Sequence, residues 1–283
     1  LKYLLRGVLR KITSFLEIAY GLKLVPASVG AILTRASRAA GLEYEELKKR
    51  IKSAARVYVD ETSFSVLGKN WWIWVFRTLN DLLLIIRPSR GKDVPLEILG
   101  ADFEGIVICD CWRAYNFLKI IQRCWSHLLR KAEKAVKEAN TKAAQNFYKK
   151  LKALFKEIKR FNRKNRNEKL RERKYWEMIK KMRSLIGYYR KYTELTEVIG
   201  YIENNLENWF TCIRFNNVEP TNNWAEQAIR ETVIVRKIIG AFRSEEGPEY
   251  YSVLASLIAT WKMRGDNIFS KLKEIFKKHY NFC

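Results

Sequence analysis

The sequence predicts an α/β protein in which a strand-containing core is preceded by a helical segment and interrupted by a long helical insertion. Strand-like apolar runs occur between Val57 and Asp110. Apolar residues recur at helical spacing on both sides of that stretch. Residues 126–209 contain no strand-like run, which predicts that the insertion is entirely helical. Apolar residues make up 48% of the chain, a content that excludes global disorder.

The N-terminal segment, residues 1–52, has apolar residues at helical spacing that are interrupted by a turn at Pro26. Two short helices around a tight turn could form a DNA-reading helix-turn-helix, but the pattern is short and degenerate and favours a helical cap on the next domain. Charged residues among the apolar ones argue against a secretory signal. No apolar run approaches the ~20 residues that a membrane-spanning helix needs, so we expect a soluble protein.

Residues 53–128 are expected to form the first part of the catalytic core. The expected elements are strands at 57–60, 71–78, 82–87 and 105–110, a hairpin turn at 79–81 and a short helix at 92–99. Residues 129–212 form the basic helical insertion, and residues 213–283 complete the core with C-terminal helices.

The charge balance favours a polyanionic partner. Lys and Arg total 54 against 30 acids, a net charge of +24, and basic groups placed on phosphates release condensed counterions. A membrane surface or an acidic protein would also attract such a chain. The five cysteines have no regular spacing, which fits a reducing cytoplasm.

The insertion carries the densest basic run of the chain. Residues 156–183 hold thirteen Lys or Arg and four Glu, interleaved with aromatic residues. Base stacking on aromatic side chains beside such charge is one use of this pattern, and we expect Arg171, Arg173 and Lys174 to contact a DNA backbone. The alternative is a solvated helical face whose aromatic residues pack in the core.

Three acids could form a metal site. Asp60 and Asp110 each close an apolar strand-like run, and carboxylates on neighbouring strands repel unless a cation neutralises them. Mg²⁺ has that role in phosphoryl-transfer sites. Glu226, on a helix entered through Asn222 and Asn223, is the natural third acid. Two acids from strands and one from a helix are the two-metal arrangement of a ribonuclease-H-like fold. Salt bridges for the aspartates, and a capping box joining Asn223 to Glu226, remain alternatives.

Basic residues follow Glu226 on the same expected helix. Arg230 and Lys237 come four and eleven residues later, so the three side chains share one face. Cations beside the acids would bind phosphate, although a Glu-to-Arg pair four residues apart is also ordinary helix stabilisation. Glu61 is expected to point away from Asp60 and to be structural.

Cysteine and histidine residues near the second acid allow two interpretations. Cys109, Cys111, Cys124 and His127 could be four zinc ligands. Free cysteines more often pack as small buried apolar groups. A role of His127 as a general base is not required either, because a metal-bound water needs no imidazole to activate it.

Long blocks of this sequence resemble the catalytic region of insertion-sequence-66-type DDE transposases. The matching blocks, in chain order, are Asp60-Glu61-Thr62, GKNWWIWV at 68–75, DCWRAY at 110–115, QRCWSHLLR at 122–130, TNNWAEQAIR at 221–230, RKIIG at 236–240 and RSEEG at 243–247. The blocks are ordered and spread over nearly the whole chain. Gln227 departs from the family, which usually has Arg there.

The resemblance implies that Asp60, Asp110 and Glu226 bind Mg²⁺, with Mn²⁺ able to substitute. It implies a ribonuclease-H-like core split by a helical insertion, and strand cleavage and strand transfer at the ends of an insertion sequence. Cys124 and His127 resemble a C-x-x-H element of related transposases that supports the fold or positions DNA, and Asn223 would support the helix of the third acid. The family's upstream zinc-binding and coiled-coil modules are not in this sequence.

The expected partners are double-stranded DNA at the element ends and target, and further copies of the chain in a homo-oligomer on DNA. The expected location is the prokaryotic cytoplasm, with nucleoid association when the protein is bound to DNA. Two alternative functions remain open. One is a DNA-binding remnant of a transposase without catalytic competence, and the other is a general ribonuclease-H-like nuclease that ignores element ends.

Overall fold

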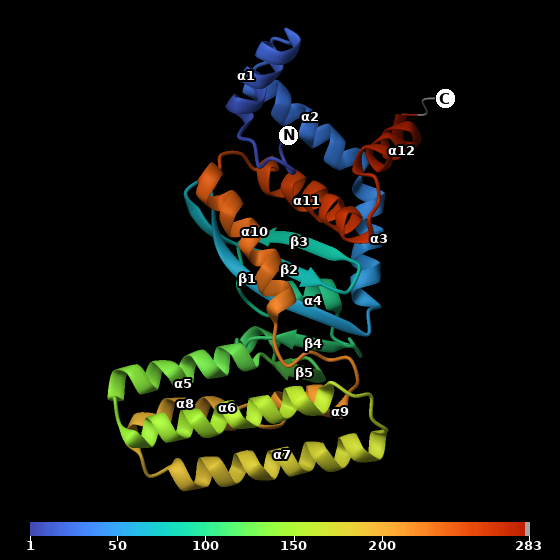
Figure 1. The fold of residues 1–283 in the computed structure, drawn as a ribbon. Coiled ribbons are helices and arrows are strands. Elements are labelled where there is room, and N and C mark those ends of the chain that lie inside the picture. Colours follow the sequence, from blue (N-terminus) through green and yellow to red (C-terminus); the bar gives the residue numbers. More distant parts are fainter. Residues whose placement is uncertain (281–283) are drawn as a thin grey trace. The chain divides into compact units, whose positions relative to one another are not determined.

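The computed structural model describes residues 1–280 and confirms a mixed α/β protein, mostly helical, in which the described residues form six strands and twelve α-helices (Figure 1). The chain divides into two compact units. One contains residues 1–103 and the chain from Trp224 onward, and the other contains residues 104–223. None of the helices in the described residues combines the length and the apolar character that crossing a membrane requires.

The first unit holds the N-terminal helices, four strands and the C-terminal helices. Its elements are α1 (Leu9–Tyr20), α2 (Pro26–Ala39), α3 (Gly41–Lys52), β1 (Arg56–Val66), β2 (Lys69–Arg77), β3 (Leu82–Arg87), α4 (Asp93–Leu99), α10 (Asn223–Ile239), β6 (Ala241–Phe242), α11 (Glu246–Arg264) and α12 (Ile268–Tyr280). Strand β2 pairs antiparallel with both β1 and β3, and β6 pairs parallel with β1. The hairpin turn expected at 79–81 is confirmed between β2 and β3.

Strand β1 is longer than the sequence predicted. It extends to Val66 because its second half, rich in Thr and Ser, pairs with β2 through a two-residue turn. Both turn residues have positive φ, 50° for Leu67 and 74° for Gly68, as hairpin twist requires. The amide of Leu67 donates to the carbonyl of Phe242 at 2.9 Å, which helps to hold a leucine in this unfavourable conformation. Asp60 therefore lies inside β1, and the expectation that it ends a strand was wrong.

Helix α11 covers the edge of β3. The hydroxyl of Ser256 accepts a hydrogen bond from the amide of Leu84 at 2.7 Å, and that of Thr260 accepts one from the amide of Leu82 at 3.0 Å. The two hydroxyls lie four residues apart on one helix face and satisfy edge amides that would otherwise be buried without partners. Sequence patterning predicted the helix but could not show that its small polar residues complete the sheet edge.

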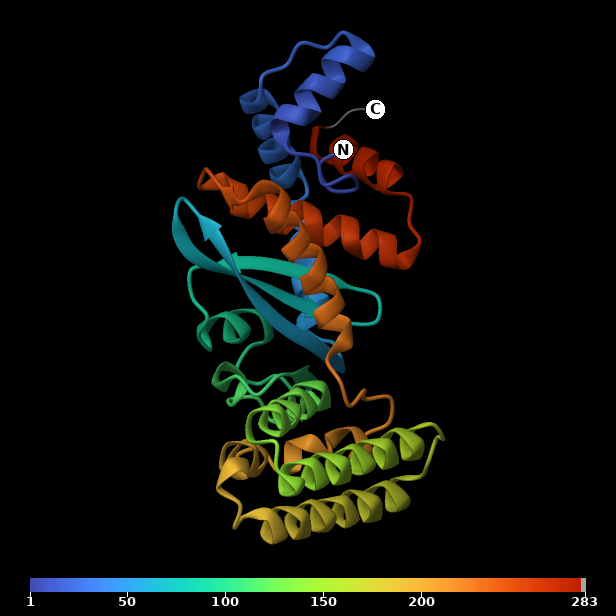
Figure 2. The same cartoon turned by 60° about the vertical axis from the view of Figure 1, so that its left-hand side comes forward.

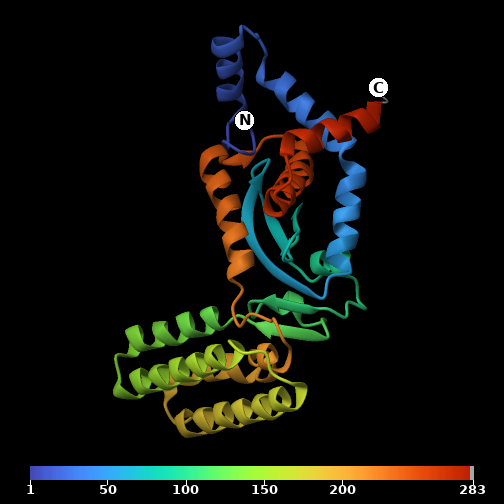
Figure 3. The same ribbon diagram turned by 45° about the vertical axis from the view of Figure 1, so that its right-hand side comes forward.

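The N-terminal helices pack against other elements of the first unit. Helix α2 contacts α11 and α12, and α3 contacts α11, α4 and β3 (Figure 3). The hydroxyl of Tyr44, on α3, donates to the carbonyl of Leu84 at 2.8 Å, so α3 also contributes to covering β3. Helices α2 and α3 thus pack on other elements of the first unit, and the helix-turn-helix and helical-cap interpretations of residues 1–52 both stay predictions.

The second unit contains a short parallel strand pair and the helices that the sequence predicted for residues 129–212 (Figure 2). Its elements are β4 (Ile106–Cys109), the 3₁₀ turn η1 (Arg113–Tyr115), β5 (Ile120–Arg123), α5 (Trp125–Ala139), α6 (Lys142–Asn162), α7 (Glu168–Tyr189), η2 (Thr193–Leu195), α8 (Thr196–Glu203), η3 (Glu207–Trp209) and α9 (Thr211–Arg214). The sequence analysis missed β5, because four residues give too short an apolar run to distinguish strand from loop.

Aromatic packing holds the insertion against the strand pair. Trp125 is fully buried and stacks on Phe155, with ring centroids 5.5 Å apart. Its indole nitrogen donates to the carbonyl of Trp209 at 2.6 Å, so the polar atom of this large side chain is satisfied. The hydroxyl of Thr211 donates to the carbonyl of Ile121 in β5 at 2.6 Å. The helices following β5 therefore pack back onto that strand.

Removing a hydroxyl from the α11–β3 contact should destabilise the first unit. Thr260→Val keeps the shape of the side chain but leaves the buried amide of Leu82 without a partner, a loss of about 1–3 kcal/mol in the free energy of unfolding. Thr232→Val is the matched control, because that buried hydroxyl bonds only to a carbonyl of its own helix. Urea unfolding measures both variants, and equal losses would contradict the edge-satisfying role of Thr260.

Candidate active site

Asp60 lies on the face of β1 that α10 covers. Tyr58, Asp60 and Thr62 share this face because side chains alternate along a strand. Trp224, at the start of α10, packs on Tyr58 with ring centroids 4.8 Å apart. Further along the helix, Arg236 donates to Thr62 Oγ1 at 3.4 Å and to a backbone carbonyl of β1. Helix α10 therefore contacts β1 on both sides of Asp60.

The start of α10 is fixed by a cationic contact with β2. Arg77 Nη1 donates to the carbonyl of Trp224 at 2.8 Å, and the guanidinium lies 5.5 Å from the centre of the indole. Partial burial lowers the pKa of Arg77 from its usual value. Together with the Tyr58 contact, this bond sets the position of the first helical turn, which carries Glu226.

Glu226 is half-buried in the first turn of α10. The helix begins at Asn223, and Glu226 is its fourth residue. The capping box of Asn223 and Glu226 therefore stays a prediction beside metal binding. Asn223, predicted to support the acid, is the exposed first residue of the helix.

Arg230 and Lys237 are exposed on α10, as their predicted role in phosphate binding requires. The helix buries Ala225, Ala228 and Thr232, which lie on another face from these two cations. Glu231, another acid of the same helix, is ion-paired with Arg6.

Asp110 follows β4 in the second unit and is held by a buried arginine. Its side-chain Oδ1 accepts a hydrogen bond from the amide of Trp112 at 2.9 Å. Its backbone carbonyl accepts one from Arg123 Nη1. Arg123 is 1% exposed and also donates to Asn116 Oδ1 at 2.6 Å and Asn205 Oδ1 at 3.0 Å. Its planar guanidinium thus ties the loop after β4 to β5 and to the helical insertion.

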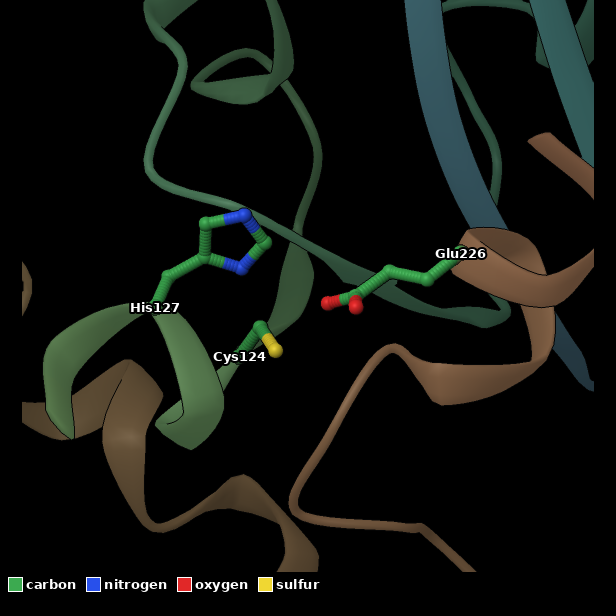
Figure 4. Close-up of side chains that lie close together, drawn as sticks. All are labelled: Cys124, His127 and Glu226. Atoms are coloured by element: carbon green, nitrogen blue, oxygen red, sulfur yellow. The ribbon is translucent and has the colours of Figure 1, made fainter. Parts of the chain in front are cut away.

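Cys124 and His127 lie at the start of α5 (Figure 4). The Cys124 sulfur and a ring nitrogen of His127 lie within 4.8 Å of each other. His127 Nε2 lies 3.1 Å from Arg130 Nη2, and because an arginine only donates, that ring nitrogen is the acceptor. Figure 4 also draws Glu226, from the first turn of α10.

The chain returns from the helical insertion to the start of α5. The carbonyl of Pro220 accepts a hydrogen bond from the amide of Trp125 at 3.0 Å, and Cys124 Sγ accepts one from the amide of Asn222 at 3.2 Å. The amide of Cys124 in turn donates to the carbonyl of Cys109 at 2.9 Å. These three bonds place the end of β4, the start of α5 and the segment before α10 together.

The four-ligand zinc interpretation is not supported. In residues 1–280, no group of three or more clustered metal-ligating side chains includes Cys109 or Cys111. Burial raises the pKa of the Cys109 thiol well above its usual value and that of Cys111 to about 11. Cys109 is buried and Cys111 half-buried, which fits the alternative interpretation of these thiols as packing groups.

The insertion residues predicted to contact DNA differ from one another. Arg171 is 3% exposed and donates to the carbonyl of Ile213 at 2.8 Å, so it braces α7 against α9. Lys174 is ion-paired with Glu157 and Glu177. Arg173 is exposed. We therefore correct the predicted set: Arg171 has a structural role, and Arg173 alone of the three presents an unpaired cation to solvent.

Sequence reasoning missed the residues that position the acids. Arg123 lies in the QRCWSHLLR block, but the sequence analysis gave it no role. A cation inside the run Ile120–Cys124 is itself a signal of a buried polar partner. Glu61 was correctly predicted to be structural: its side chain is 2% exposed and ion-paired with Arg90 at 3.0 Å. Arg77 had no distinguishing sequence signal, because its partner is a backbone carbonyl. Arg236 lies in the RKIIG block but was given no role.

Replacing Arg123 should loosen the loop that carries Asp110. Arg123→Lys keeps the charge but cannot reach all the partners of the guanidinium, so we expect the free energy of unfolding to fall by about 2–4 kcal/mol. Arg113→Lys, at an exposed position of the same loop, is the control and should have little effect. Urea unfolding followed by circular dichroism checks both. A change within ~0.5 kcal/mol for Arg123→Lys would show that the hydrogen bonds of the buried guanidinium contribute little to stability.

Comparison with known proteins identifies the family. Residues 2–250 match the model of the family described as "Transposase IS66 family". The uncharacterized protein y4qI of Sinorhizobium fredii (strain NBRC 101917 / NGR234) is 26% identical over 254 residues, which cover 77% of this chain and 46% of that protein. The chain thus spans about half the length of this curated relative. Since the family match covers most of its length and all three candidate acids, the chain belongs to the transposase IS66 family.

Proposed function

We propose that the chain is a DDE-type DNA transposase that catalyses Mg²⁺-dependent strand cleavage and strand transfer at the ends of an insertion sequence. Its core would be ribonuclease-H-like, with Asp60, Asp110 and Glu226 as the metal-binding acids. Membership of a transposase family supports action on DNA. The net charge of +24 supports the same partner.

The observation that carries the assignment of the acids is the path of the chain. Asp110 follows Cys109, which is hydrogen-bonded to Cys124, and Cys124 is hydrogen-bonded to Asn222. Glu226 comes only four residues after Asn222, in the first turn of α10. Helix α10 then follows the face of β1 that carries Asp60. The chain path therefore favours one site for three acids that are far apart in sequence.

The donor set fits a hard divalent cation. Three carboxylates offer only oxygen ligands, which suit Mg²⁺ and Mn²⁺ better than softer metals. Bound there, such ions would activate the attacking oxygen, water or a DNA 3′-hydroxyl, and stabilise the leaving oxygen. The three acids would hold this charge beside the scissile phosphate.

Other residues would hold the DNA rather than react with it. Arg230 and Lys237 are exposed on the helix that carries Glu226 and would bind phosphates flanking the cut. Cys124 and His127 would support the site from the start of α5. We expect double-stranded DNA at the element ends and the target as substrate, and a homo-oligomer assembled on it. An acid-dependent reaction distinguishes this function from that of a DNA-binding remnant.

Neutralising any of the three acids should abolish cleavage while DNA binding persists. Asp60→Asn, Asp110→Asn and Glu226→Gln each remove a ligand charge with little change of shape. We expect nicking of a plasmid that carries the two element ends to fall by on the order of 10³ or more. The assay follows Mg²⁺-dependent conversion of supercoiled to nicked plasmid.

Glu231→Gln is the matched control, since it neutralises an acid of the same helix that is paired with Arg6. It should nick at close to the parent rate. Parent-level activity of Glu226→Gln would remove Glu226 from the site. Metal-dependent nicking that ignores the element ends would indicate a general nuclease, and no nicking by the parent would indicate a binding remnant.

A further inference from the structure

One exposed face of α7 carries a regular row of cations around a tryptophan. Lys169, Arg173, Trp176, Lys180 and Arg183 follow one another at intervals of four, three, four and three residues, which places them on one side of a helix. We call these five residues the α7 stripe. All are exposed, Trp176 to 49%. At 1.5 Å per residue the stripe is about 21 Å long.

The stripe lies opposite the packed side of the helix. Helix α7 buries Tyr175, Met178, Met182 and Leu185 among other residues, and it contacts α6 and α9. Figures 1 and 2 show α7 at the outside of the helical layer of its unit. The stripe therefore lies away from the packed side of α7.

The cations of the stripe are not neutralised within the protein. In residues 1–280, none of its four cationic side chains takes part in an ion pair or a hydrogen bond. By contrast, the lysines that directly follow Arg173 and Lys180 are ion-paired. Both Lys174 and Lys181 pair with Glu157 and Glu177. The same helix thus has one basic face that is internally neutralised and one that remains available to an external anion.

Trp176 is exposed and yet held in place. Its indole nitrogen donates to Glu172 Oε1 at 2.9 Å, and Glu172 is itself paired with Arg214 at 3.0 Å. The ring also meets Tyr175 edge-on, with centroids 5.1 Å apart. An apolar ring fixed in water between cations has lost part of its conformational entropy before any ligand arrives, which favours stacking on a flat partner.

We propose that the α7 stripe binds DNA whose bases are unpaired, with its four cations on the phosphates of one strand and Trp176 stacked on a base. The charge selects a polyanion, and the central indole selects bases that are free to stack, which an intact duplex does not offer along its length. This assignment rests on the proposed action on DNA and adds a second contact region, on the insertion, for a separated strand.

The charge of the stripe is tested by salt dependence. Binding of the full chain to a fluorescein-labelled oligo-dT strand and to a duplex of equal length is measured by anisotropy, without divalent metal, over a range of salt concentrations. Arg173→Gln/Lys180→Gln should lower the slope of log affinity against log salt by about 1.4 for the single strand. The control Lys174→Gln/Lys181→Gln removes two charges one position further along, where they are ion-paired, and should leave the slope nearly unchanged.

The tryptophan is tested by its preference for unpaired bases. Trp176→Ala should weaken single-strand binding by about 5- to 150-fold and duplex binding by less than about twofold. Tyr188→Ala is the aromatic control, since Tyr188 is 60% exposed but lies off the stripe on the same helix. Thermal melting checks that each variant is folded.

The proposal would be overturned if Trp176→Ala weakened binding to the single strand and to the duplex equally. It would also be overturned if Arg173→Gln/Lys180→Gln and Lys174→Gln/Lys181→Gln changed the salt slope by the same amount. Competition by polyglutamate as effective as that by oligo-dT at equal charge would also overturn it. The binding assay contains no divalent metal and so does not depend on the three candidate acids. A negative result for strand binding by the stripe would therefore not contradict the proposed cleavage site. If the chain did not cleave DNA, strand binding by the stripe could still be measured.

Discussion

The return of the chain from the helical insertion to the end of the β4–β5 pair is the constraint on which the proposed site depends. A hydrogen bond from Asn222 to Cys124 closes a segment of the chain in which the two residues are 98 positions apart. Closing a flexible loop of that length costs about 4 kcal/mol in chain entropy. The closure is stabilised by the buried contacts of Trp125 with Phe155, Trp209 and Phe210.

Each unit has an arginine that bonds to the backbone beside its candidate acids. In the second unit, the buried guanidinium of Arg123, at the end of β5, hydrogen-bonds to the backbone carbonyl of Asp110. In the first unit, contacts of Trp224 and Arg236 with β1 fix α10 over the strand that carries Asp60. In both, an arginine bonded to backbone carbonyls does the positioning. A guanidinium stays charged and has several donors in one plane, so it suits this task better than lysine.

Much of this arrangement was predictable from the sequence, and the predictions that were wrong or missing have identifiable physical reasons. Periodicity located the helices, because long amphipathic patterns are strong signals. It did not show that β1 continues past Asp60, since the polar half of that strand is set by its pairing with β2. It could not separate Arg171 from Arg173, whose different environments arise from packing against α9. The blocks around the acids predicted the family, which the comparison confirmed.

The central claim, that Asp60, Asp110 and Glu226 together bind divalent metal, is tested most directly by titrating Mn²⁺ into the full chain and measuring the bound ion calorimetrically or by electron paramagnetic resonance. The account predicts that the parent binds Mn²⁺ and that neutralising any one of the three acids weakens binding at least about tenfold, on the basis of the lost ligand charge. Unchanged Mn²⁺ affinity after neutralising Glu226, with the chain still folded, would contradict it.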